Sequence, residues 1–385
     1  MKDLQMAYES WRSVNPGGTK RVVVTRELPG SRWLDVLTDA GCAVEVNLKG
    51  ELTHADTAAA VGKRCDGVIG YVTESWGEEL FSALKWAGGR AYSNYAAGFN
   101  NVDLKAATRN GTAVGNTPGV ISETVAEMAV ALTFAAARRI PESERFLRAG
   151  RWRAVGYPPT LFLGERLFRK TLGIIGAGRI GESYARMMVE GHKMNLVYYD
   201  LNRNERLEEY IKRYNAFIQL ERLPAVTCQR LSTVEELLEA ADVVSIHTVL
   251  DDSTRHLINA ERLGRMKPNA LLVNASRGPV VDKKALAEHL SKHPDFRAGL
   301  DAFENEPELT PGLAELDNVV LVPHIGSATL WTREAIGLLA AANIAGILMG
   351  YPVWNRSNME PFLNADLPKT APSILNATEL NLPLY

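Results

Sequence analysis

The sequence predicts an α/β protein with two domains, each built on a parallel sheet with helices on both faces. Short apolar runs alternate with helical stretches from Lys20 to about Val322, and this alternation is typical of parallel sheets. A glycine fingerprint at residues 176–181 (GAGRIG) lies between two of the apolar runs. The chain has 385 residues, 46% of them hydrophobic, which is enough for two cores.

The first part of the chain alternates in this way but has no glycine fingerprint of its own, and we interpret it as a domain that contributes substrate contacts. Residues 1–19 are expected to form a loose lead-in that ends at the breaker Pro16-Gly17-Gly18. Strands are predicted at residues 21–25, 43–46, 67–71, 90–95 and 112–115, and helices at 31–40, 55–61, 78–86 and 104–109.

The chain then changes character. After the break at residues 116–119 (NTPG), a long amphipathic helix is predicted at 123–139, with Ser122 as its cap. Such a helix suits a spine between domains. Residues 141–170 are expected to form an irregular arm whose aromatic side chains serve a subunit interface, a lid or ordinary local packing.

The glycine fingerprint predicts a dinucleotide site. Gly176 permits a tight turn out of a strand, Gly178 lets the backbone approach a pyrophosphate, and Gly181 lets helix and strand pack closely. Asp200 ends the next strand, where its carboxylate can accept hydrogen bonds from an adenosine ribose. Because a carboxylate repels a 2′-phosphate, we expect NADH to be preferred over NADPH, although Arg203 close by could soften that preference.

The rest of the chain continues the alternation, with polar residues where strands end. Ligands bind at the carboxyl ends of the strands in open parallel sheets, so Arg277, Asp301, Glu306 and His324 are informative. Strands are predicted at residues 172–175, 194–199, 242–247, 270–274, 297–300 and 319–322, and helices at 181–191, 203–214, 234–240, 259–265, 283–291 and 332–348.

The last helix is apolar on most faces, so we expect it to pack back on the first domain and make that domain discontinuous. The predicted domains are therefore residues 1–118 with 331–385, which bind substrate, and residues 119–330, which bind NAD. Residues 350–385 are rich in Pro and Asn and are expected to be extended.

Three of the strand-end residues suit the reduction of a 2-oxo acid. Histidine is the side chain best suited to donate a proton near neutral pH, so His324 is the candidate proton donor to the developing alkoxide. A carboxylate from Glu306 would favour the protonated imidazole and fix its orientation. Arg277 can bind a substrate carboxylate through two parallel hydrogen bonds and polarise the carbonyl. A hydride passing from a nicotinamide to C2 would complete the reaction.

Composition excludes several classes of partner. The formal net charge of −2 offers no electrostatic footprint for nucleic acid, and the wholly apolar runs are too short to cross a bilayer. Cys42, Cys65 and Cys228 show no paired or metal-ligand spacing. We expect these cysteines to be buried or inert, and we expect no metal.

At this point the motifs resemble the D-isomer-specific 2-hydroxyacid dehydrogenase family, which the chain matches over about residues 20–350. The matching segments are 116–119 (NTPG), 176–181 (GAGRIG), 274–278 (NASRG), 299–303 (GLDAF) with 306–307 (EP), and 323–326 (PHIG). The resemblance implies two Rossmann-like or flavodoxin-like domains with a cleft between them, a homodimer, and Arg277, Glu306 and His324 as the catalytic set. It also implies that backbone near Ala97, Gly98 and Phe99 contacts the substrate carboxylate. Cofactor contacts are expected from Gly176, Gly178, Arg179, Ile180, Gly181, Asp200, Arg203, His247, Thr248, Ala275, Ser276, Asp301 and Gly326.

Within that family the chain looks like the plant and algal photorespiratory hydroxypyruvate reductases, which reduce hydroxypyruvate to D-glycerate with NADH, and glyoxylate less well. The segments that carry this match are 184–191 (YARMMVEG), 331–334 (WTRE), 350–354 (GYPVW) and 361–364 (PFLN). The plant enzymes end in a Ser-Lys-Leu peroxisomal address. This chain ends in NLPLY, so we expect cytosol, or an organelle such as the mitochondrion, rather than import by that signal.

Other interpretations stay open. The protein could be a glyoxylate, D-lactate or D-glycerate 3-phosphate dehydrogenase, although the short segment after residue 348 disfavours a phosphoglycerate enzyme with a regulatory domain. Formate dehydrogenase is disfavoured, because it lacks the partner that Glu306 supplies. From a different class, the transcriptional corepressors use this fold as an NADH-sensing interaction module and keep the same Arg, Glu and His.

Overall fold

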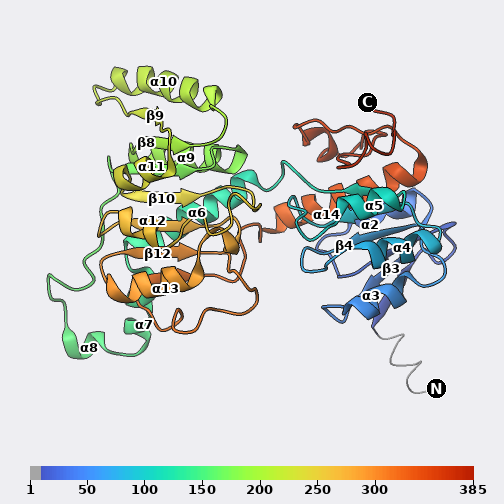
Figure 1. Ribbon diagram of the computed structural model, residues 1–385, viewed down its shortest axis with the longest axis horizontal. Coiled ribbons are helices and arrows are strands. Elements are labelled where there is room, and N and C mark those ends of the chain that lie inside the picture. Colours follow the sequence, from blue (N-terminus) through green and yellow to red (C-terminus); the bar gives the residue numbers. More distant parts are fainter. Residues whose placement is uncertain (1–9) are drawn as a thin grey trace. The chain divides into compact units, whose positions relative to one another are not determined.

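A computed structural model describes residues 10–385, which form two compact units (Figure 1). Unit 1 combines the chain up to Ile121 with Ala328–Tyr385, and unit 2 is the continuous segment Ser122–Ser327. The sequence placed these boundaries at 118/119 and 330/331. The roles predicted for the two domains stay a prediction.

Unit 1 contains a six-stranded sheet in the order β1-β3-β2-β4-β5-β6 among the described residues. All neighbouring pairs are parallel except β1 with β3, which is antiparallel. The strands are β1 (Trp11–Val14), β2 (Lys20–Val24), β3 (Cys42–Asn47), β4 (Gly67–Gly70), β5 (Ala91–Asn94) and β6 (Ala113–Gly115); the helices are α2 (Arg32–Asp39), α3 (His54–Val61), α4 (Glu78–Trp86), α5 (Leu104–Arg109) and α14 (Leu330–Met349).

The prediction of a loose lead-in was wrong for Trp11–Val14, which form the edge strand β1 paired with β3. The strand is only four residues long and its side chains are half-buried or exposed, so it gives no apolar run that stands out in the sequence. The first nine residues of that lead-in lie outside the described residues.

Helices cover both faces of this sheet, so its strands β4, β5 and β6 are buried on both sides. Val22 and Val24 of β2 face a core shared with α2 and α14, while Val23 between them faces the core under α3, α4 and α5. This alternation follows the two-residue period of a strand. In the second core, the rings of Trp76 and Tyr92 pack with centroids 4.4 Å apart.

Helix α14 is the central helix of the first core. It packs on α2, β4, β5 and β6, and Asn343 at its middle donates to the carbonyl of Asn116 at 2.9 Å and accepts from the N–H of Ser373 at 2.8 Å. Its length and mean hydropathy would suffice to cross a membrane, but 83% of its apolar window is buried inside the fold. Burial in a core accounts for that composition.

The predicted extended tail was only partly correct. Residues after Gly350 form the short helix η2 (Glu360–Phe362) and several turns. Val353, Ala371 and Ile374 are completely or almost completely buried, so the tail completes the core of unit 1.

Unit 2 contains a seven-stranded parallel sheet in the order β13-β12-β11-β10-β7-β8-β9. The chain moves outward from β7 in one direction and returns to β10 beside it, which makes a topological switch point between these strands. The strands are β7 (Thr171–Ile175), β8 (Asn195–Tyr199), β9 (Cys228–Arg230), β10 (Val243–Ile246), β11 (Leu271–Asn274), β12 (Arg297–Leu300) and β13 (Val319–Leu321).

Helices α6 and α9 cover one face of this sheet and α11, α12 and α13 the other, while α10 lies beside β9 (Figure 1). The helices are α6 (Ser122–Ala137), α7 (Ile140–Arg148), α8 (Trp152–Val155), α9 (Arg179–His192), α10 (Glu205–Leu220), α11 (Val234–Ala240), α12 (Ala260–Arg265) and α13 (Lys283–Lys292), with the short helix η1 (Gly278–Val280).

Three predictions for unit 2 needed correction. The arm at 141–170 is not wholly irregular, because it contains α7 and α8, none of whose residues is buried. The helix predicted at 203–214 begins at Glu205 and runs on to Leu220. The strand β9 was missed, because its three residues are half-buried or exposed.

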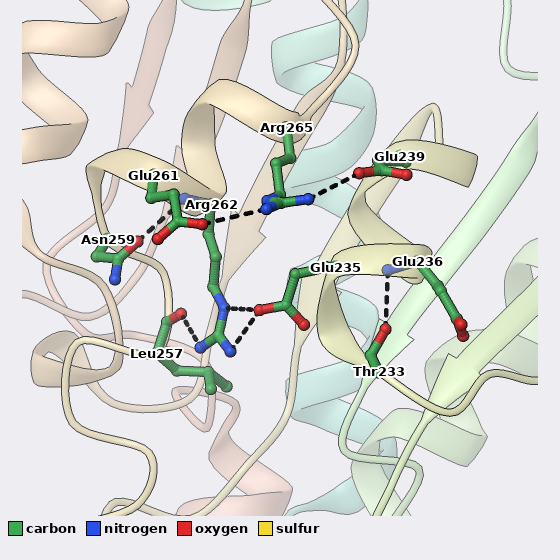
Figure 2. A network of polar contacts seen from close by, with 9 residues as sticks. All are labelled: Thr233, Glu235, Glu236, Glu239, Leu257, Asn259, Glu261, Arg262 and Arg265. Atoms are coloured by element: carbon green, nitrogen blue, oxygen red, sulfur yellow. Dashed lines mark hydrogen bonds and ion pairs between the residues drawn. The ribbon is translucent and has the colours of Figure 1, made fainter.

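A charge network joins α11 to α12 (Figure 2). Arg262 of α12 binds Glu235 of α11 through Nε at 2.8 Å and also donates to the carbonyl of Leu257 at 2.8 Å. Arg265 connects Glu239 and Glu261, at 3.1 and 3.2 Å. The network thereby fixes the segment between β10 and α12, which borders the candidate site.

Candidate active site

The glycine fingerprint lies at the switch point of the second sheet, between β7 and α9. Gly176 has φ +92°, and a Cβ there would lie 2.8 Å from the carbonyl carbon of His247. A Cβ on Gly181 would lie 2.2 Å from the carbonyl oxygen of Gly176. Both residues must therefore be glycine for the fold itself, in line with the tight turn and close packing predicted for them.

Gly178 differs from its two neighbours in the fingerprint. It precedes the first residue of α9, and a Cβ built on it would meet no atom within 4 Å. Its φ of −73° is open to any residue. Since the fold does not require a glycine here, the free space beside its backbone suits the approach of a pyrophosphate at a helix N-terminus. Arg179 is exposed and Ile180 half-buried in the first turn of α9.

The carboxylate of Asp200 lies at the end of β8, beside the fingerprint. Its Oδ2 accepts from the N–H of Ala177 at 2.8 Å and its Oδ1 from the N–H of Asn202 at 3.0 Å. These bonds orient the carboxylate while each oxygen keeps further acceptor capacity. Arg203, also predicted to contact the cofactor, pairs with Glu208 at 2.6 Å, and its contact with cofactor stays a prediction.

His247 and Thr248 follow β10, next to Gly176. The imidazole Nε2 lies 2.8 Å from the Ser245 hydroxyl, and burial lowers the pKa of His247 to about 3, so the ring is neutral. His247 Nδ1 and Thr248 Oγ1 are buried polar atoms without a hydrogen-bond partner. Such atoms are rare in folded proteins, and they fit a site whose polar contacts come from a bound dinucleotide.

The predicted proton donor and its carboxylate partner are in direct contact. His324 Nδ1 lies 2.7 Å from Glu306 Oε2, and the other carboxylate oxygen of Glu306 accepts from the N–H of Phe303 at 2.8 Å. Burial raises the pKa of Glu306, but the His324 hydrogen bond, the Phe303 N–H and the charge of Arg277 together bring it below its usual value. Glu306 is therefore ionised and accepts the hydrogen of Nδ1.

Glu306 also interacts with Arg277, the third predicted catalytic residue. Burial lowers the pKa of Arg277, and the charge of Glu306 opposes that shift. A guanidinium that loses most of its water in this way is a strong site for a carboxylate. Its Nη1 donates to the carbonyl of Ser276 at 2.8 Å.

Asp301 has a structural use that the sequence did not reveal. This side chain is 2% exposed, and its two oxygens accept from the N–H groups of Ile325 and Gly326, at 2.6 and 2.8 Å. These bonds hold the segment around His324, whose φ is +51°, an uncommon value for a residue other than glycine. Burial raises the pKa of Asp301.

A second histidine–glutamate pair lies at the same edge of the sheet. His256 Nε2 is 2.9 Å from Glu304 Oε1, two residues before Glu306 in the chain. Sequence analysis assigned Glu306 to His324 and gave Glu304 no role. The structure separates them, since Glu304 faces His256 and Glu306 faces His324.

The remaining predicted cofactor contacts lie after β11. Ala275 is buried. The Ser276 hydroxyl donates to the side-chain oxygen of Asn274 at 2.8 Å, and Asn274 Nδ2 donates to the carbonyl of Arg277 at 3.0 Å. Asn274, which sequence reasoning did not assign to the site, therefore shapes the turn that positions Ser276 and Arg277.

The predicted substrate-binding backbone lies in unit 1, after β5. The carbonyl of Ala97 accepts from Asn116 Nδ2 at 2.7 Å, and that of Gly98 accepts from Asn94 Nδ2 at 2.8 Å. Phe99 is 38% exposed. Two side-chain amides thus orient this loop from within unit 1, and its contact with substrate stays a prediction.

Taken together, unit 2 is a dinucleotide-binding α/β unit whose strand ends hold a glutamate and a histidine in contact, with an arginine whose charge acts on that glutamate. Its residues 130–326 match the family model of the D-isomer specific 2-hydroxyacid dehydrogenase NAD-binding domain. Over 375 residues, the whole chain is 53% identical to the glycerate dehydrogenase HPR, peroxisomal, of Arabidopsis thaliana, covering 96% of this chain and 97% of that protein. The glycerate dehydrogenase of Cucumis sativus is also 53% identical, over 95% and 97% of the two chains.

A solved structure gives the same picture. The TT0316 protein from Thermus thermophilus superposes with a TM-score of 0.76 and 35% identity, over 92% of this chain and 99% of that one. The chain therefore belongs to the D-isomer specific 2-hydroxyacid dehydrogenases, and it is an oxidoreductase with an NAD-binding domain.

Proposed function

We propose that this enzyme reduces hydroxypyruvate to D-glycerate with NADH, as expected of a photorespiratory-type hydroxypyruvate reductase, and that glyoxylate is a poorer substrate. The observation that supports a 2-oxo acid reductase best is the 2.7 Å contact between His324 and Glu306 beside Arg277. The 53% identity to two plant glycerate dehydrogenases supports this substrate within the family.

In this proposal Arg277 binds the substrate carboxylate and polarises the carbonyl. The N–H groups of the loop at Ala97–Phe99 would bind the same carboxylate. Because Glu306 accepts the hydrogen of Nδ1, the imidazolium presents its second proton at Nε2. His324 transfers that proton to the oxygen on C2 and is left as a neutral ring, still hydrogen-bonded to Glu306.

The cofactor would be bound by the fingerprint glycines, by Asp200, and by the unpartnered atoms of His247 and Thr248. Bound NADH supplies the hydride. The free space at Gly178 and the carboxylate of Asp200 are the features that support this placement. Preference for NADH over NADPH follows from the charge of Asp200 and is part of the proposal.

We also propose a homodimer. Apolar side chains of α7, α8 and the segment after them are exposed, and a monomer would leave them in water. They include Leu147, Trp152, Tyr157 and Leu163, of which Tyr157 is 87% exposed. Sedimentation at micromolar concentration tests this, with Trp152→Ser as the variant expected to weaken association.

Loss of NADH absorbance with hydroxypyruvate, glyoxylate and pyruvate in parallel tests the substrate, and repeating the series with NADPH tests the cofactor. We expect the highest kcat/KM for hydroxypyruvate with NADH. A higher kcat/KM for glyoxylate or pyruvate would contradict hydroxypyruvate as the preferred substrate, but it would not change the family to which the enzyme belongs. Binding of NADH without turnover of any 2-oxo acid would contradict the proposal as a whole.

A further inference from the structure

The segment after β8 is the part of unit 2 in which dinucleotide choice is expected to be decided. It reads Asp200-Leu201-Asn202-Arg203-Asn204, so Arg203 is its single cation. An arginine in this region can accommodate a 2′-phosphate, while an acid binds the 2′-hydroxyl. The chain therefore has both kinds of side chain, three residues apart, and the structure shows how each is used.

Arg203 is held by a neighbour on the first turns of α10. Its Nε lies 2.9 Å and its Nη2 2.6 Å from Glu208 Oε2, an arrangement in which the guanidinium edge is occupied. The other carboxylate oxygen of Glu208, Oε1, accepts from the hydroxyl of the buried Tyr198 at 2.6 Å. Glu208 is thus fixed by β8 on one side and binds the guanidinium on the other.

The charges of the pair agree with this geometry. The Arg203 and Tyr198 hydrogen bonds lower the pKa of Glu208, so the carboxylate is ionised throughout the neutral range. The Arg203 side chain is 61% exposed, and that of Glu208 only 22%. The arginine is therefore the movable member of the pair, and it needs only a change of rotamer to leave.

The other arginines nearby have partners of their own. Arg230 donates to the carbonyls of Asp200 and Leu201, at 2.9 and 3.0 Å. Arg206 pairs with the buried Glu182 at 2.7 Å. Arg203 differs from both, because it lies in the loop after β8 and its partner Glu208 lies in the first turn of α10, the helix that follows this loop.

We propose that Glu208 is a specificity-determining residue for the dinucleotide, because it occupies the guanidinium of Arg203 and so withholds that cation from a 2′-phosphate. The proposal rests on the NADH preference of the proposed function and extends it from Asp200 to a second acid. Rejection of NADPH then has two sources, direct repulsion by Asp200 and neutralisation of Arg203 by Glu208.

The test is equilibrium binding, in which the Kd values of NADH and NADPH are measured by quenching of protein fluorescence without substrate. Glu208→Gln keeps an acceptor for the Tyr198 hydroxyl and removes the charge that holds Arg203. We expect the ratio of the NADPH Kd to the NADH Kd to fall about fivefold, the size of one solvent-exposed charge-assisted contact. The fall in this Kd ratio should be smaller in added salt of about 0.5 M, because salt screens the interaction between Arg203 and the 2′-phosphate.

Two further variants decide the cause. The double variant Glu208→Gln/Arg203→Ala should return the Kd ratio to its wild-type value, because the freed cation is absent. Glu209→Gln is the matched control, since this neighbour on α10 pairs with Arg213 at 3.0 Å instead, and its Kd ratio should equal the wild-type ratio. Thermal melts show that each variant is folded.

An unchanged Kd ratio in folded Glu208→Gln would overturn the proposal. So would a fall in the ratio that persists in the double variant, because Glu208 would then act by direct repulsion. The wild-type ratio tests the proposed function separately. If wild type bound both dinucleotides equally, the NADH preference would fail, while the effect of Glu208 on NADPH through Arg203 would still be judged by the variants.

Discussion

Gly178 is the fingerprint position at which cofactor binding can be separated from folding. A Cβ at Gly176 or Gly181 would collide with backbone at 2.8 or 2.2 Å, so alanine there would disturb the protein itself. A Cβ at Gly178 meets no atom within 4 Å, and its φ of −73° suits alanine. Gly178→Ala therefore adds one methyl group to the space expected for the pyrophosphate and changes little else.

The size of the effect follows from these contacts. Without a collision or strained backbone, the substitution should leave the free energy of unfolding unchanged or raise it by about 0.4–1 kcal/mol through the unfolded chain. In the complex, a methyl group forced into a packed contact costs about 1–3 kcal/mol. That cost corresponds to a rise in the Kd of NADH of roughly 5- to 150-fold.

The assay is titration with NADH followed by protein fluorescence, together with a thermal melt. Gly191→Ala is the matched control, because Gly191 lies near the other end of the same helix and its Cβ would also meet nothing. We expect the control to bind NADH normally. Wild-type affinity in Gly178→Ala would refute the reasoning, since the backbone at Gly178 would then not approach the cofactor.

Four other perturbations test the site. Glu306→Gln should move the upper limb of the pH–rate profile for reduction to lower pH, because the protonated ring of His324 loses its carboxylate; an identical profile would count against the pair. Arg277→Ala should raise KM and lower kcat together, by about 100-fold or more in kcat/KM for a charged contact of about 3 kcal/mol, and normal values of both would exclude it as the carboxylate site. Asp200→Ala should reduce the ratio of NADH to NADPH affinity, and a constant ratio would place selectivity elsewhere. Burial holds the pKa of His247 at about 3, so below about pH 6.5 the unfolded chain binds a proton that the folded chain does not, and stability falls as the pH drops from about 6.5 toward 3. The His247→Gln variant lacks this titrating group. When the pH is lowered from about 7.5 to about 5.5, the unfolding free energy of wild type should therefore fall by about 1.4 kcal/mol more than that of the variant. Equal falls, measured by urea unfolding, would contradict a neutral His247.

Much of the fold could be predicted because buried elements leave a periodic pattern. The strand at 297–300 and the helices at 78–86, 104–109 and 234–240 have the bounds that the sequence predicted. Short or exposed elements are harder to identify. The helix α8 and the edge strand β1 have four residues each, too few to show a period. The helix α7 is amphipathic but has no buried residue, so its pattern does not mark it as part of a core.

The candidate site shows a similar limit. The residues that the motifs mark, Arg277, Glu306 and His324, are brought together as predicted, while their catalytic roles stay a prediction, as does the compartment. The pair at the loop after β8, Arg203 and Glu208, involves a residue without a motif. Glu208 lies five positions after Arg203, a spacing that does not place two side chains together on one helix face, and Arg203 precedes α10. Their contact depends on how the loop turns, which one-dimensional spacing does not determine.

The discontinuity of unit 1 has a consequence for synthesis on the ribosome. The surface on which α14 packs includes Trp33 and Asn116, which are translated before unit 2. Asn343 of α14 and Ser373, which complete this core, are translated after unit 2. Unit 2 is continuous and lies wholly between them in the chain. The apolar face of the N-terminal sheet that α14 covers therefore stays exposed during synthesis while unit 2, about 200 residues long, is translated at roughly 5–20 residues per second. Only when the last helix is released from the exit tunnel can that sheet acquire its second layer.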